Sequence, residues 1–119
     1  MTPDSARAAL ASQLAEHGED VVLKRRIGTG ATFDQVTVRA FIRGFRPDEL
    51  VGGITQQDSR IIMGQEEILA AGWPMTAGGF AWPRNGDFIL IGGQQRAITA
   101  GTAIRLGGEI VRLEATAKG

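Results

Sequence analysis

Hydrophobic and polar residues alternate with a period of two over most of the chain that follows residue 20. The clearest run extends from Gln35 to Arg43, and a period of two predicts a β-strand with one face in a core. Its apolar face would carry Val36, Val38, Ala40 and Ile42. Similar patterns predict five further strands, at residues 21–26, 59–63, 88–91, 94–100 and 109–117.

Two helices are predicted beside these strands. Thr2 suits the N-cap of the first helix, Pro3 suits its first turn, and Gly18 suits a left-handed C-cap after His17. The apolar residues of this helix are mostly alanine. It therefore buries little surface by itself and needs a close partner, either its own sheet or another subunit. A second helix of about two turns is predicted at residues 65–71, ended by Gly72.

Glycine accounts for 17 of the 119 residues, about twice its usual share of ~7%, which favours tight turns between short strands. Gly92-Gly93 predicts a two-residue hairpin, and Asn85-Gly86 predicts another turn. Residues 88–91 are apolar on both faces, so that strand is expected to be buried on both. A short bridge is expected between Gly101 and the turn at Gly107-Gly108.

These elements predict a mainly β (α+β) fold. The expected architecture is a small antiparallel β-barrel or sandwich of about six strands, with an N-terminal α-helix and a short second helix. We expect a single domain over residues 1–119, with the helix at 1–18, the barrel at 19–119, and long loops at 44–58 and 72–86.

Charge and composition exclude several classes of function. Thirteen basic and thirteen acidic residues give a formal net charge of zero, which disfavours a dedicated nucleic-acid-binding protein. The absence of cysteine excludes disulfides, thiolate metal sites and thiol catalysis, and a single histidine, His17, excludes a multi-histidine metal site. No signal peptide or long apolar run is evident, so we expect a soluble chain made inside the cell.

No pattern in the chain predicts an active site, a cofactor site or a metal site. Gly28-Thr29-Gly30 lacks the third glycine of a dinucleotide fingerprint, and a strand rather than a helix follows it. Glu66 and Glu67 would diverge by about 100° on a helix, so they do not form a catalytic pair. No residue that could act as a general base is predicted near the serines, so nucleophilic catalysis has no support. We therefore expect a protein that is not an enzyme.

Two clusters are open to more than one interpretation. Lys24-Arg25-Arg26 is the main basic run, and in a strand Arg25 would face away from the other two. The run would act either as a solvated strand edge or as a contact for phosphates or an acidic partner. The aromatic residues Trp73, Phe80 and Trp82 would act either as core plugs or as an interface anchor.

The order of the elements resembles a known family. An Ala-rich helix precedes a strand, a hairpin loop and the alternating strand, and a Pro/Gly-rich connection follows at residues 46–54. The most specific part is the hairpin segment Pro83-Arg84-Asn85-Gly86-Asp87-Phe88-Ile89-Leu90-Ile91-Gly92-Gly93. Over nearly its whole length the chain is similar to the head–tail connector proteins of tailed phages and prophages, in particular the head-completion or stopper group that includes the lambda-type head–tail joining protein. Gene-transfer-agent particles carry similar proteins.

The resemblance implies a homo-oligomeric ring at the connector of a virion assembled in the bacterial cytoplasm. Its subunits often stay monomeric until they meet the growing connector. The ring would contact portal or adaptor and tail-terminator proteins, retain packaged double-stranded DNA with only weak contact, and bind no membrane. Its channel-closing loop would lie between the second and third strands, with candidate residues Phe45, Arg46, Leu50, Val51, Gly52, Gly53 and Ile54. Trp73, Phe80 and Trp82 would be the candidate subunit or tail interface.

Alternatives remain. A tail terminator or tail-tube subunit is also a small β-rich ring former. A different class is an OB-like module that binds single-stranded nucleic acid through Lys24, Arg26, Arg39 and Arg43, although Phe41 is the one aromatic residue expected beside Arg39 and Arg43.

Overall fold

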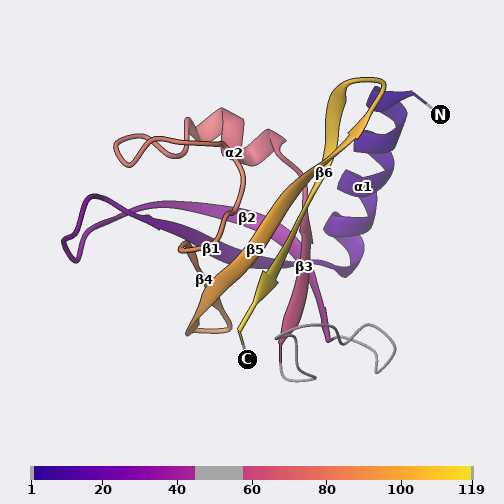
Figure 1. The fold of residues 1–119 in the computed structure, drawn as a ribbon. Helices are drawn as coiled ribbons and strands as arrows, with labels where there is room; N and C mark the ends of the chain where they lie inside the picture. The colour runs from indigo at the N-terminus through magenta and orange to yellow at the C-terminus, as the bar shows by residue number, and fades with distance from the viewer. Residues whose placement is uncertain (1, 45–57, 119) are drawn as a thin grey trace.

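The computed structural model describes residues 2–44 and 58–118, and within them six strands close into one antiparallel barrel (Figure 1). Around the barrel the strands follow the order β1-β2-β3-β6-β5-β4. The elements are α1 (Pro3–His17), β1 (Glu19–Arg26), β2 (Phe33–Gly44), β3 (Ser59–Met63), α2 (Glu66–Ala71), β4 (Phe88–Ile91), β5 (Gln94–Leu106) and β6 (Glu109–Ala117). The predicted fold class is confirmed, and the barrel is favoured over the sandwich.

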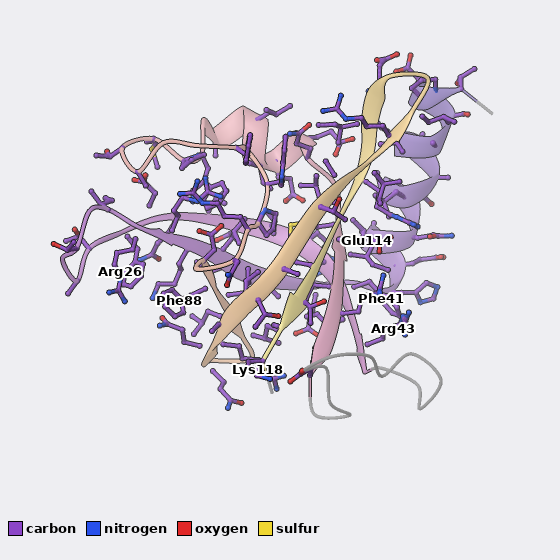
Figure 2. The ribbon with its side chains drawn as sticks, in the orientation of Figure 1. Arg26, Phe41, Arg43, Phe88, Glu114 and Lys118 are labelled. Atoms are coloured by element: carbon purple, nitrogen blue, oxygen red, sulfur yellow. The ribbon has the colours of Figure 1, made fainter. Side chains whose placement is uncertain are left out.

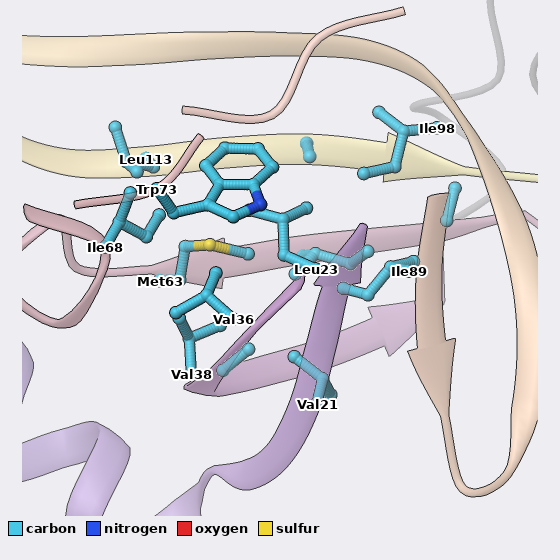
Figure 3. Packing of buried hydrophobic residues seen from close by; sticks show 14 residues of the cluster. Val21, Leu23, Val36, Val38, Met63, Ile68, Trp73, Ile89, Ile98 and Leu113 are labelled. Atoms are coloured by element: carbon cyan, nitrogen blue, oxygen red, sulfur yellow. The ribbon is translucent and has the colours of Figure 1, made fainter. Parts of the chain in front are cut away.

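The barrel interior is filled by alternate residues of the strands (Figure 3). In β2, Val36, Val38 and Ala40 are buried and Thr37 is exposed, as the alternation predicted. Trp73, from the segment that follows α2, also packs into this core, and its indole Nε1 donates a hydrogen bond of 2.9 Å to the Asp34 carbonyl. A filled interior leaves the outer surface as the place where the chain can interact with other molecules.

Two predicted strand features are wrong. In β4, Ile89 is buried but Phe88 and Leu90 are only half-buried, because none of the described elements covers the outer face of the strand. β5 continues through Gly101 to Leu106, where a bridge was expected, because the two irregularities in its pairing with β6 let it bend without ending. The hairpin at Gly92-Gly93 is confirmed, with positive φ angles of 56° and 83° that suit a type I′ turn.

Helix α1 begins as predicted but ends differently. Thr2 and Ser5 form a reciprocal capping box at its start. Gly18 is extended, with φ −86° and ψ 178°, so the predicted left-handed C-cap is wrong. Glycine is needed there for a different reason, because a Cβ atom would lie 2.5 Å from the Leu14 carbonyl oxygen and 3.0 Å from that of Ala40.

Candidate interaction surfaces

Arg25 is a buried charge at the centre of a hydrogen-bond network. As predicted, it faces the opposite side of β1 from Lys24 and Arg26, and its side chain is only 2% exposed. Its Nε and Nη2 donate to the two carboxylate oxygens of Asp87 at 2.9 and 2.8 Å. The remaining N–H groups donate to the carbonyls of Gly78, Phe80 and Trp82. All five donors of the guanidinium therefore have an acceptor.

The network fixes the segment between α2 and β4 in one conformation. The Asp34 carboxylate accepts hydrogen bonds from the backbone N–H groups of Thr76 and Ala77, at 2.8 and 2.6 Å. The Asp87 carboxylate also accepts the N–H of Arg84 at 3.0 Å, so Asp87 fixes the turn as well as Arg25. These buried charges are fully engaged with the chain itself, and their role is to hold the segment.

The aromatic residues on this segment were interpreted either as core plugs or as an interface anchor, and their burial differs. Trp73 is 2% exposed and belongs to the core. Phe80 is 57% exposed and stacks in parallel on the half-buried Trp82, with ring centroids 4.7 Å apart. Met75 is 61% exposed. We name the stacked pair Phe80 and Trp82 the aromatic knob. Phe80 is the residue for which an interface role stays a prediction.

The outer face of β1 carries a second cluster, the cation–aromatic surface, formed by Lys24, Arg26, Phe33 and Phe88. Phe33 and Phe88 pack edge to face, with centroids 5.7 Å apart. Lys24 Nζ lies 4.6 Å from the Phe33 ring, and the Arg26 guanidinium lies 5.6 and 5.7 Å from the rings of Phe33 and Phe88. Figure 2 shows Arg26 beside Phe88.

The sequence analysis did not predict this surface, nor the pairing of part of β1 on both sides. The aromatic rings come from β2 and β4, which lie on either side of β1, and their meeting depends on barrel closure. For the same reason the strand-edge interpretation is wrong for Lys24, which lies opposite Phe88 of β4 as well as Gln35 of β2. It is also wrong for Arg25, which is buried, whereas Arg26 lies beyond the pairing with β4 and pairs with β2 alone. Alternation along β1 was the available signal, since it had already placed Lys24 and Arg26 together on the outside.

The arginines outside β1 interact mainly with other groups of the chain itself. Arg39 donates from Nε to the Leu14 carbonyl at 3.0 Å, which ties it to the end of α1. Glu114 pairs with both Arg60 and Arg112 on the outside of β3 and β6. Arg43 also has an interaction partner. The candidate channel-closing loop lies outside the described residues. Its candidate residues are Phe45, Arg46, Leu50, Val51, Gly52, Gly53 and Ile54.

Helix α1 leaves a groove on the barrel wall, which we name the helix groove. Arg7, in the first half of the helix, donates hydrogen bonds to the Ile110 carbonyl at 3.0 Å and to the Glu109 carboxylate at 3.1 Å. Arg39 donates to a carbonyl of the last turn. Of the described side chains of α1, Leu14 alone is buried. The groove has a volume of about 720 Å³. Apolar and polar side chains line it in equal number: Leu10, Leu14, Phe41 and Ile62, with Gln13, Glu16, His17 and Arg112.

The described residues form no cluster of metal-ligating side chains. Over residues 2–44 and 58–118, no three or more His, Asp or Glu side chains gather in a way that could hold a metal ion. Glu67 accepts the N–H of Arg39 at 3.0 Å, and His17 is exposed beside Glu16. None of the helices in the described part of the chain is long and apolar enough to cross a membrane.

Comparison with known proteins adds no relative. No protein-family model matches the chain, and no curated protein matches it significantly. The surfaces described above are therefore the basis for a functional proposal, together with the resemblance in the order of elements.

Proposed function

We propose that the protein is a structural component of a tailed-phage, prophage or gene-transfer-agent particle. In this role it is a head–tail joining or stopper protein that forms a ring at the connector, retains packaged DNA and docks the tail. The observation that supports the proposal is the fixed aromatic knob, because an exposed aromatic ring held in one position suits contact with another protein.

The energetics of the knob support an assembly role. Burial of the Arg25–Asp87 pair costs several kcal/mol in desolvation, which the pairing itself must offset. The segment held in this way displays Met75 and Phe80 to water, where they contribute little to the stability of the isolated chain. A prearranged apolar surface instead lowers the entropic cost of binding a partner. This arrangement favours a docking part over a catalyst.

The channel-closing role rests on the resemblance alone. The segment at residues 45–57 connects β2 to β3, which is the position of the closing loop in stopper-type relatives. Leu50 and Val51 remain the residues of choice for testing that role.

Gene deletion tests the proposal in the parent phage or prophage. We expect electron microscopy of the induced particles to show separate tails beside heads that have lost their DNA. Complementation with the wild-type gene should restore joined virions, and complementation with a Leu50→Ala, Val51→Ala double variant should leave DNA loss. Leu69→Ala removes an apolar side chain that is 59% exposed on α2 and is the matched control.

Two outcomes would contradict the stopper role. Normal joined virions from the deletion strain would exclude any connector function. Heads that keep their DNA beside abnormal tails would instead indicate a tail terminator or tail-tube subunit.

A second candidate function is contact with single-stranded nucleic acid, and the cation–aromatic surface is the observation that favours it. Aromatic rings beside cations suit base stacking and phosphate contact together. If this function holds, Arg26→Ala combined with Phe88→Leu should weaken binding of a labelled oligonucleotide about tenfold at low salt. Arg105→Ala removes an exposed charge from β5 and should change affinity little. Equal losses for both variants, or no binding in a salt series, would exclude this candidate.

A further inference from the structure

We infer that the Asn85-Gly86 turn is a site of spontaneous covalent modification, which the fold restrains and which releases the aromatic knob once it has occurred. The reaction converts Asn85 into isoaspartate and needs no reactant other than water. Asn85 is the one asparagine of the chain, and it is followed directly by glycine, which has no side chain to shield its backbone nitrogen. The inference goes beyond the proposed function and does not depend on it, because it is argued from the chemistry of the turn.

The reaction joins two neighbouring groups of the chain. The backbone nitrogen of Gly86 attacks the side-chain Cγ of Asn85, so that an N–Cγ bond forms. The Cγ–Nδ2 bond breaks, and Nδ2 leaves as ammonia with the proton that the Gly86 nitrogen gives up. Water then opens the resulting five-membered imide at one of its two carbonyl carbons. Opening at the main-chain carbonyl gives isoaspartate, in which the backbone runs through Cβ and Cγ, and opening at Cγ gives aspartate.

The turn presents both reacting residues to water. Asn85 and Gly86 are exposed, at the second and third positions of the turn that runs from Arg84 to Asp87. Gly86 has a φ of 98°, and a Cβ atom there would meet nothing within 4 Å, so the turn has open space around it. Formation of the imide and its opening by water therefore have the room that they need.

Hydrogen bonds of the turn restrain the reaction. The Gly86 N–H donates to the Ile98 carbonyl at 3.1 Å, so the attacking nitrogen is held against β5. The Asp87 N–H donates to the Arg84 carbonyl at 3.1 Å, and the Asp87 carboxylate accepts the Arg84 N–H at 3.0 Å. The attack requires the Gly86 nitrogen to give up its proton and to turn toward Cγ, and both changes break the bond to Ile98. We therefore expect modification only in molecules in which the turn has opened.

Isoaspartate in this turn disconnects the knob from its support. It adds one carbon to the backbone between the Arg84 carbonyl and the Asp87 N–H, which the hydrogen bond of a β-turn holds together. Asp87 then moves away from Arg25, whose Nε and Nη2 donate to its carboxylate. Arg25 also donates to the carbonyls of Phe80 and Trp82. The change therefore reaches the stacked rings, although neither of them takes part in the reaction.

The rate of deamidation tests the restraint. We expect peptide mapping by mass spectrometry to show that the folded wild-type chain deamidates at Asn85 at least about tenfold more slowly than the same chain in urea. Equal rates in buffer and in urea would overturn the inference, and so would a chain that stays unmodified in urea. Arg25→Met removes the partner of Asp87 and should raise the rate in buffer, whereas Arg26→Met should leave it unchanged. The comparison of wild-type rates stands by itself even where Arg25→Met lowers stability.

A second measurement tests the release of the knob. Wild-type chain that has been converted in urea is refolded, and its isoaspartate form is separated by chromatography. Asn85→Asp is the matched control, because it adds the same charge without the additional backbone carbon. We expect a red shift of tryptophan emission and stronger quenching by acrylamide in the isoaspartate form alone, since Trp82 is half-buried beside Phe80. An isoaspartate form with the emission and quenching of Asn85→Asp would overturn the release of the knob.

Discussion

Replacement of Arg25 by Met should lower the free energy of unfolding by about 3–5 kcal/mol. Methionine is similar in length but leaves the Asp87 carboxylate buried without its partner. It also leaves the carbonyls of Gly78, Phe80 and Trp82 without their donor. Urea denaturation followed by tryptophan fluorescence measures the change, and Trp73 and Trp82 report on the segment that Arg25 holds.

Arg26→Met is the matched control, because Arg26 follows directly on the same strand and points outward. Its substitution should change stability by no more than about 0.5 kcal/mol, as for most surface positions. Adding Asp87→Leu to Arg25→Met should recover part of the loss, since it removes the unpaired buried charge. Equal effects of Arg25→Met and Arg26→Met would show that the buried network does not hold the fold.

Substitution of Gly101 by Ala should destabilise the barrel by about 1–3 kcal/mol. A Cβ atom at this position would lie far inside the van der Waals contact distance of the Pro83 carbonyl oxygen, which belongs to the backbone and cannot rotate away. Relief therefore requires β5 or the segment that crosses it to move. Differential scanning calorimetry measures the effect as a lower Tm.

Gly30→Ala provides the control for Gly101→Ala. A Cβ atom at Gly30 would meet nothing within 4 Å, so only the small intrinsic difference between the two residue types remains. A Tm for Gly101→Ala equal to that of Gly30→Ala would contradict the close approach of β5 to Pro83.

Local signals were sufficient to predict most of the secondary structure. The strand Ser59–Met63 and the strand Glu109–Ala117 have the bounds that alternation predicted. The two glycine pairs form turns between β4, β5 and β6. These features depend on residues close in sequence, so one chain is enough to find them. The fold class followed because six short strands have few ways to bury one face each.

The surfaces could not be predicted in the same way, because they depend on contacts between distant residues. Arg25 was expected on the opposite face from its neighbours, but its partner Asp87 is 62 residues away. Phe33 and Phe88 meet only because the barrel brings β2 and β4 to either side of β1. The helix groove depends on the distance between α1 and the barrel wall. The alanine content of the helix indicated that it buries little surface, but it did not determine that distance.

Closure of the barrel has a consequence for the rate at which this chain folds. The hairpins β1–β2, β4–β5 and β5–β6 join strands that are consecutive in sequence, so we expect them to form first. The pairings β1–β4 and β3–β6 join distant strands, with Leu23 opposite Ile89 and Ile61 opposite Ala115. The chain must lose the entropy of these long loops before their contacts stabilise it. Folding in milliseconds to seconds follows, slower than a helical protein of equal length. Because the acceptors of Arg25 lie 53 to 62 residues away in sequence, we expect the aromatic knob to take its fixed position only after the barrel has closed.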